Sequence, residues 1–154
     1  MTSTEEIKDY LVQVFVADVT LSTLLGTDAA GDVPVYKGWQ FGQHPVLPSV
    51  TVTDVSDVGE VSGLGDGFDG STKSEWSFVV VQIDVWASSE SERDQVAQRI
   101  RELMLGDNLF SIGCCFNSVL ALSMNEAEDL IFRKCLRYTV FYQVEVSAEE
   151  GAPE

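Results

Sequence analysis

The residue types best suited to catalysis are scarce in this sequence. His44 is the single histidine, and it stands between Gln43 and Pro45 in a segment rich in Gly and Pro. A general base must lie within hydrogen-bond reach of the proton that it removes, beside neighbours that tune its pKa. Any histidine relay to a serine or cysteine would have to pass through this one residue. We therefore predict no catalytic residues and no enzymatic activity.

Residues 57–74 contain two patterns that could bind a ligand. Asp66 and Asp69 offer carboxylate oxygens of the kind that Ca2+ prefers, but their spacing matches no EF-hand loop. The glycines around them match a phosphate-binding loop in type, but no Lys-Ser or Lys-Thr pair follows them at P-loop spacing. Both patterns are typical of a plain flexible loop, so we predict no metal and no cofactor.

The cysteines do not form a metal-binding or redox motif. Cys114 and Cys115 are adjacent, Cys135 stands apart, and no Cys-x-x-Cys spacing occurs. Adjacent cysteines rarely bond to each other because the ring is strained. We predict that these residues are small buried side chains in a reducing cytoplasm.

Arg133, Lys134 and Arg137 hold a third of the positive charge of the chain, whose Lys and Arg total 9. One interpretation is local pairing with the acidic residues at 126–129, because opposite charges this close in sequence usually meet. The other is a patch of ion pairs between subunits. The sequence leaves both open, and all three residues are candidate interaction residues.

The composition excludes several classes of protein. The chain has 154 residues and 16.9 kDa, with 45% hydrophobic and 22% charged residues. This is the size and composition of one folded domain, over residues 1–154. No apolar run is long enough for a membrane span, and the acidic N-terminus is not typical of a secretory signal.

The net charge is strongly negative. Lys and Arg total 9 against 25 Asp and Glu, which gives −16. Such a surface repels phosphates and anionic lipids, so we predict neither membrane binding nor direct sequence-specific nucleic acid binding. Concentrated salt screens the self-repulsion of such a chain, which favours a halophilic host. The alternative is an ordinary acidic protein.

Three helical segments are expected. Ser3 with Glu6, and Ser89 with Glu92, fit capping boxes at the starts of two helices. Between them, a short helical turn after Asp18 ends at Gly26 as a C-terminal cap. The second capped helix should end at Gly106.

Strands are expected at 33–36, 49–58, 76–86, 119–124 and 131–147. In the third of these, Ser77, Val79, Val81, Ile83 and Val85 should face the core. The glycine-rich stretch 57–74 should be a long mobile hairpin loop, residues 107–118 irregular, and 148–154 a flexible acidic tail. Consecutive strands joined by loops predict an α+β fold, with a mainly antiparallel sheet of four to five strands and the helices on one face.

The predicted core combines one face from each of these elements. It consists of Ile7, Leu11, Val14, Val52, Val79, Val81, Ile83, Val96, Ile100, Leu103, Val140 and Val144.

Apolar side chains outside this core are candidate interaction residues. Trp76 and Trp86 stand at the two ends of the less apolar face of their strand. Val61, Leu64 and Phe68 lie within the long glycine-rich loop. Aromatic and apolar side chains left over from a core tend to anchor interfaces.

Several of these segments together resemble a known family. They are LLG at 24–26, VY at 35–36, PSVTV at 48–52, VQIDVWA at 81–87, LMLG at 103–106 and RYTV at 137–140. Over roughly residues 5–147, the chain resembles the tail-completion or tail-terminator proteins of long-tailed phages and related archaeal tailed viruses. The glycine-rich insertion at 57–74 and the stretch 107–118 depart from that pattern.

The resemblance implies a structural role in a virion. Such proteins form a ring, usually a hexamer, that terminates the tail tube and joins it to the head connector. The implied partners are further copies of this chain, the tail tube protein, and a connector or head-closure protein. The implied location is the tail or neck of the virion, after synthesis in the host cytoplasm. Two alternatives remain: another neck or head-closure subunit, and a small ligand-binding α+β domain with 57–74 as a lid.

Overall fold

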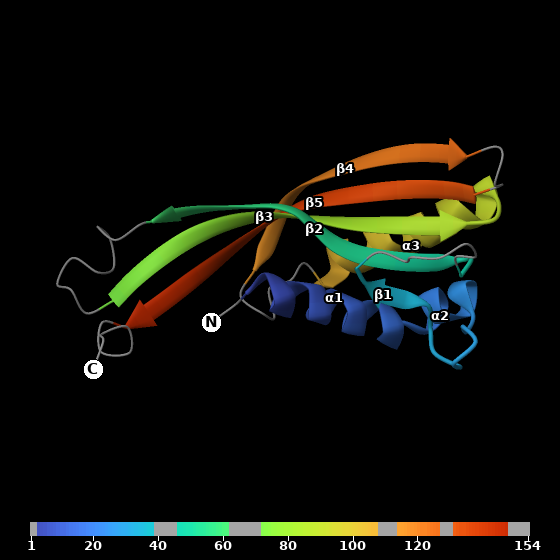
Figure 1. Ribbon diagram of the computed structural model, residues 1–154, viewed down its shortest axis with the longest axis horizontal. Coiled ribbons are helices and arrows are strands. Elements are labelled where there is room, and N and C mark those ends of the chain that lie inside the picture. The colour runs from blue at the N-terminus through green and yellow to red at the C-terminus, as the bar shows by residue number, and fades with distance from the viewer. Residues whose placement is uncertain (1–2, 39–45, 62–71, 108–113, 127–130, 148–154) are drawn as a thin grey trace.

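The computed structural model describes residues 3–38, 46–61, 72–107, 114–126 and 131–147. These residues form a five-stranded sheet with helices packed on one of its faces (Figure 1). The α+β class predicted from the sequence, with a mainly antiparallel sheet and helices on one face, is confirmed.

The first two helices begin at the side chains that the sequence indicates. α1 spans Thr4–Ala17, and the backbone N–H of Glu6 donates to Ser3 Oγ at 3.2 Å. α2 spans Val19–Leu25, and its first turn is capped by Asp18, whose Oδ2 accepts from the N–H of Leu21 at 2.8 Å. α2 ends at Gly26, whose φ of 74° lies in the left-handed region that glycine adopts without steric cost.

α3 spans Glu90–Asp107 and is capped by Ser89. The N–H of Glu92 donates to Ser89 Oγ at 3.2 Å, while the N–H of Arg93 donates to the Ser89 carbonyl at 3.1 Å. This confirms the second capping signal. The helix continues one residue past Gly106, where the sequence suggested its end.

The sheet has the strand order β1-β2-β3-β5-β4. Its strands are β1 at Val35–Lys37, β2 at Ser49–Val61, β3 at Thr72–Ala87, β4 at Cys115–Glu126 and β5 at Ile131–Ser147. β1 pairs with β2 in parallel, and the remaining neighbours are antiparallel. β5 therefore lies between β3 and β4, the strand that precedes it in sequence.

A bulge interrupts the pairing of β2 with β3. Asp54 pairs with Val81 and Ser56 with Val80, so Val55 is the extra residue, and its side chain is exposed. A bulge of this kind reverses the inward and outward alternation along a strand. It explains why the apolar alternation of this segment falls out of phase after Asp54.

Three strands, β2, β3 and β4, are longer than the sequence predicts. The predicted loop at 57–74 is wrong at both ends: β2 continues to Val61, and β3 starts at Thr72. Gly59 and Glu60 are poor strand formers, but they pair with Ser77 and Trp76 of β3, and cross-strand pairing outweighs local preference. The irregular segment predicted at 107–118 is likewise wrong at its end, because β4 starts at Cys115.

The core lies between the helices and the sheet. Nine of the predicted members are buried: Ile7, Leu11, Val52, Val79, Val81, Ile83, Val96, Ile100 and Val140. Val14 and Leu103 are half-buried and pack against this cluster. The side chain of Val144 lies outside the described set.

The sheet extends beyond the helices at one end. Residues 58–61 of β2, 72–76 of β3 and 143–147 of β5 form a three-stranded projection, which we call the arm (Figure 1). β4 contributes nothing to the arm, since its pairing with β5 stops at Phe141. The arm therefore has β3 in its centre and two edge strands.

Candidate interaction surfaces

A polar network crosses the sheet face that the helices leave uncovered. Asp84 of β3 is fully buried, and its Oδ1 accepts from Arg133 Nε at 2.9 Å and pairs with Nη2 at 2.8 Å. Its Oδ2 accepts from Gln82 Nε2 at 2.7 Å, and Gln82 Oε1 accepts from Arg137 Nε at 3.1 Å. The register explains these contacts, because Gln82 lies opposite Arg137, and Trp86 lies opposite Arg133.

Trp86 covers one end of this network. Its indole Nε1 donates to Thr51 Oγ1 at 3.0 Å, and the Arg133 guanidinium lies 4.7 Å from the ring centroid. Cation–π contact of this type adds to the ion pair and holds the guanidinium in place. The candidate residue Trp86 is therefore engaged within its own chain and is half-buried.

Lys134, the third cation of the cluster, faces the helix layer. Its Nζ lies 3.4 Å from Asp94 Oδ1 of α3. The hydrogen bond from Arg93 lowers the pKa of Asp94, and Lys134 adds a smaller effect in the same direction. Arg133, Lys134 and Arg137 thus have partners on β3 or α3 of the same chain. Residues 127–130, which hold part of the predicted acidic partner segment, lie outside the described residues.

Two of the other candidate interaction residues lie in the arm. Trp76 pairs in register with Glu60 and Gln143, and Val61 pairs with Glu75 as the last residue of β2. The side chains of both are outside the described set, as are Leu64 and Phe68 altogether. The structure therefore places two of these residues at the arm and does not test their contacts.

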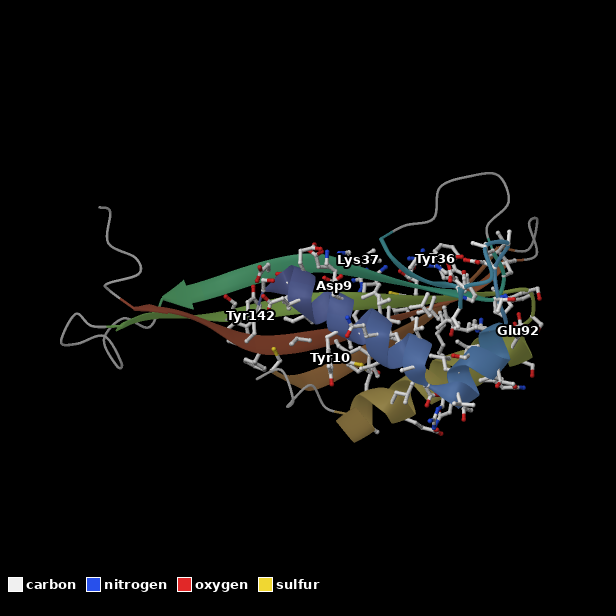
Figure 2. The ribbon with its side chains drawn as sticks, turned by 90° about the horizontal axis from the view of Figure 1, so that it is seen from below. Asp9, Tyr10, Tyr36, Lys37, Glu92 and Tyr142 are labelled. Carbon is white, nitrogen blue, oxygen red and sulfur yellow. The ribbon has the colours of Figure 1, made fainter. Side chains whose placement is uncertain are left out.

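Ion pairs connect α1 to β1 and β2. Lys8 contacts Glu5 and Asp54, each at 2.8 Å. Lys37 of β1 contacts Glu5 at 2.8 Å and Asp9 at 2.9 Å, and Figure 2 labels Asp9 on α1 with Lys37 close to it. The hydrogen bonds from Lys37 and Lys8 lower the pKa of Glu5 to about 2.

Beside these pairs, the surface is hollowed. The hollow has a volume of about 320 Å3 and is lined by Lys8, Lys37, Gly38, Val52, Thr53 and Asp54. Both lysines are already paired with carboxylates, so little positive charge is left for an anionic ligand.

Polar contacts also fix the base of the arm. The hydroxyl of Tyr142 donates to Asp57, at 3.0 Å to Oδ1 and 2.8 Å to Oδ2. Thr4 Oγ1 at the start of α1 donates to Asp57 Oδ2 at 3.2 Å. These contacts join β2, β5 and α1 at the point where the arm leaves the body.

Asp18 joins two helices. Besides capping α2, it accepts from Arg99 of α3, at 2.9 Å to Oδ2 and 2.7 Å to Oδ1. The Arg99 guanidinium lowers the pKa of Asp18, and the hydrogen bond from the Leu21 N–H contributes a smaller decrease. Arg99 also pairs with Glu102 at 3.1 Å.

Cys114 and Cys135 carry buried thiols that form no disulfide. Burial raises the pKa of the Cys135 thiol, and the negative charge of the nearby Asp84 raises it further. A thiol in such surroundings stays protonated and is a poor nucleophile or metal ligand. The prediction of small buried side chains is confirmed for these two, and the side chain of Cys115 is not described.

The remaining sequence-based candidates lie outside the described residues. They are His44, Asp66, Asp69, the glycines around them, and the acidic segment 148–154. Within the described ranges, no group of three or more His, Cys, Asp or Glu is placed to hold a metal ion. No described helix combines the length and apolarity that a membrane span requires.

The buried network around Asp84 is the feature that sequence reasoning missed. Its signal was present, since Gln82 and Asp84 are polar residues two apart in an otherwise apolar strand. Their partners could not be assigned, because a shift of one residue in the β3–β5 register would send every side chain to the other face.

Comparison with known proteins identifies a fold but no family. No protein family model matches the sequence, and no curated protein matches it. Among solved structures, the chain is similar to a chain in the virion of a native gene transfer agent particle. That similarity has a TM-score of 0.52 and 16% sequence identity, and it covers 88% of this chain and 92% of the other. Because it covers most of both chains, the fold of this chain as a whole is similar to that of the virion chain.

Proposed function

We propose that this protein is a structural subunit of a tailed virus or a related phage-like particle. In its specific form, the proposal places a ring of subunits, six in number, at the head-proximal end of the tail tube. There the ring terminates the tail and joins it to the head connector. The protein acts through contacts with other proteins and not through catalysis.

The observation that carries the proposal is the fold similarity to a chain of a gene transfer agent virion, over 88% of this chain and 92% of that one. The similarity therefore extends over most of both chains. A sequence resemblance to tail-terminator proteins points to the same kind of particle. The two arguments use different features: short sequence segments in one, and the course of the backbone in the other.

The shape of the molecule adds support for a role in assembly. The arm carries strands beyond the helix layer, where they can reach a neighbouring molecule (Figure 1). Buried polar side chains of the body have partners within the chain, as expected for a rigid building block.

Electron microscopy of particles that carry a tagged copy of this protein tests the proposal. We expect density for the tag at the junction of head and tail, and depletion of joined particles when the gene is removed. Density in another layer of the neck would favour the alternative of a head-closure subunit. Intact particles that lack the protein would contradict a virion role altogether.

The alternative of a small ligand-binding domain predicts a different behaviour in solution. Such a domain would be a monomer at every salt concentration, with a melting temperature that rises when its ligand is added. Size-exclusion chromatography with light scattering distinguishes this monomer from a ring.

A further inference from the structure

β4 is an edge strand that lacks most of the features that usually protect one. In the sheet order β1-β2-β3-β5-β4, its inner side pairs with β5 and its outer side with no described strand. Native edge strands are commonly protected by charges, proline, bulges or short length. β4 is long, contains no proline, and carries its single charge at its last residue, Glu126. Its pairing with β5 is irregular between Phe116 and Ser118, and from Ser118 to Glu126 the register is continuous.

The lack of charge is unusual for this chain. No charged residue occurs between Asp107 and Glu126, the longest such interval in a sequence with a net charge of −16. In the middle of β4, Ala121, Leu122 and Ser123 are exposed. A second negatively charged molecule can therefore approach this edge without placing carboxylates opposite carboxylates.

The opposite edge of the sheet, formed by β1 and the uncovered part of β2, is also open. β1 covers β2 only at Val50–Val52, so the outer side of β2 from Thr53 to Val61 pairs with no described strand. Two of the carboxylates there are engaged within the chain: Asp54 pairs with Lys8, and Asp57 accepts from Tyr142. Beyond the bulge, residues 56–61 are in continuous register with β3.

The strand directions allow the two edges to pair. β4 is antiparallel to β5, which is antiparallel to β3, which is antiparallel to β2. β4 and β2 of one molecule therefore run in opposite directions. Rotation about an axis along the strands preserves these directions, so β4 meets β2 of the next copy as an antiparallel neighbour.

We propose that the outer edge of β4 binds the open edge of β2, residues 53–61, from a second copy of this chain. The contact joins two different surfaces, so its repetition generates a ring when the rotation closes. This inference rests on the proposed function, and it names the surface that joins neighbouring subunits. Each subunit contributes both edges, so in a closed ring the outer side of β4 and residues 53–61 of β2 are covered in every copy.

Proline substitutions on β4 test the contact. The pairing through β5 and β3 puts Val119 and Leu120 of β4 level with Asp54 and Thr53 of β2. Successive amides of a strand point to opposite sides, so in the pair Val119→Pro and Leu120→Pro one variant loses an outward amide and the other loses a bond to β5. The outward variant should fold, as judged by circular dichroism and thermal melting. It should remain a monomer by light scattering in molar NaCl, where the wild type forms rings.

Val19→Pro is the matched control, because Val19 is exposed at the first position of α2, where helices tolerate proline. This variant should assemble as the wild type does. A folded β4 proline variant that forms normal rings would overturn the edge contact and leave the proposed ring intact. A wild type that is monomeric in both salts and absent from particles would remove the proposed function as well.

Amide hydrogen exchange of the wild type provides a test that needs no variant. Peptides from β4 and from 53–61 should both exchange more slowly in the assembly than in the monomer. Slowing in β4 alone would indicate pairing of β4 with its own symmetry copy, and slowing in neither would place the interface elsewhere. Either result overturns the proposal.

Discussion

At the scale of single residues, Asp84 and Arg133 depend on each other. Asp84 has no solvent contact, and Arg133 is largely covered, with 20% of its side chain exposed. A buried carboxylate that loses its cation partner keeps its desolvation cost without compensation. Gln82 and Trp86 extend the dependence, since each contacts one member of the pair.

The first prediction concerns this pair. Asp84→Asn and Arg133→Met should each lower the free energy of unfolding by about 1–3 kcal/mol, because each leaves a buried polar partner unsatisfied. The double variant should lose less than the sum of the two, which a double-mutant cycle of urea melts measures. Additive losses would contradict coupling. Ring assembly should persist wherever the variant remains folded.

The second prediction concerns acid stability. Lys37 and Lys8 lower the pKa of Glu5 to about 2 from an ordinary value of 4.5. A carboxyl whose pKa is lower in the folded state stabilises the fold above its unfolded pKa, and that contribution disappears as the pH falls from about 4.5 through about 2. Glu5→Gln should therefore remove part of the difference in stability between pH 6 and pH 3.

The measurement is a series of urea melts at both pH values and at low salt. Glu6→Gln is the matched control, because Glu6 lies on the same turn of α1 and has no cation partner among the described residues. An identical pH dependence of Glu5→Gln and the wild type would show that the ion pairs of Glu5 contribute nothing to stability.

At the scale of elements, β3 is the central strand and supplies most of the core of the sheet. Val79, Val81, Ile83 and Val85 alternate inward and are all buried. Any shift of β3 by one residue would expose this set and bury the opposite one. Its neighbours β2 and β5 are thus held in one register by the packing of β3 against the helices.

The third prediction follows from this packing. Ile83→Ala should lower the free energy of unfolding by about 2–5 kcal/mol, from lost transfer energy and the cavity that remains. Ile83→Val, which removes a single methylene group, should cost about 0.5–1.5 kcal/mol. Equal effects of the two substitutions in urea melts would mean that the site collapses around the smaller side chain.

Local signals in the sequence account for most elements but not for their lengths. Ser3, Asp18 and Ser89 mark helix starts because capping is a contact within a few residues. The ends of β2 and β3 were missed because Gly59 and Thr72 extend strands only through partners on other strands. The partners of Arg133 were missed for the same reason, since they depend on register and not on proximity in sequence.

At the scale of the whole molecule, salt has two opposite effects on the stability of the fold. Salt screens the ion pairs around Lys8 and Lys37, which destabilises the fold. Salt also screens the general repulsion within a chain of charge −16, and this second effect stabilises the fold. Exposed pairs contribute little individually, so the loss of repulsion should dominate.

The fourth prediction tests the hypothesis of a halophilic host. The thermal midpoint should rise between low salt and molar NaCl, and ring formation should strengthen over the same range. Potassium glutamate in place of NaCl provides a control for specific chloride effects. A midpoint that is equal in low and molar salt would contradict the hypothesis and leave an ordinary acidic protein.

The fifth prediction concerns residues 62–71, the segment that connects β2 to β3 in the sequence. Residues 62–71 replaced by two glycines should leave the body folded, because Val61 and Thr72 keep their strand partners in this design. We propose that Leu64 and Phe68 contact a neighbouring subunit or the tail tube, so the variant should lose assembly or joining to tails. Full assembly and joining by this variant would identify the segment as a passive connection.

The strand order also determines when the sheet can form during synthesis. β4 leaves the ribosome before β5, but its place in the sheet lies beyond β5, so it has no described partner strand until residues 131–147 have been made. In a released chain that ends before β5, the longest uncharged stretch of the sequence is left without its partner strand. Truncation before Ile131 should therefore produce chains that aggregate and require chaperones, whereas truncation after Ser147 should not.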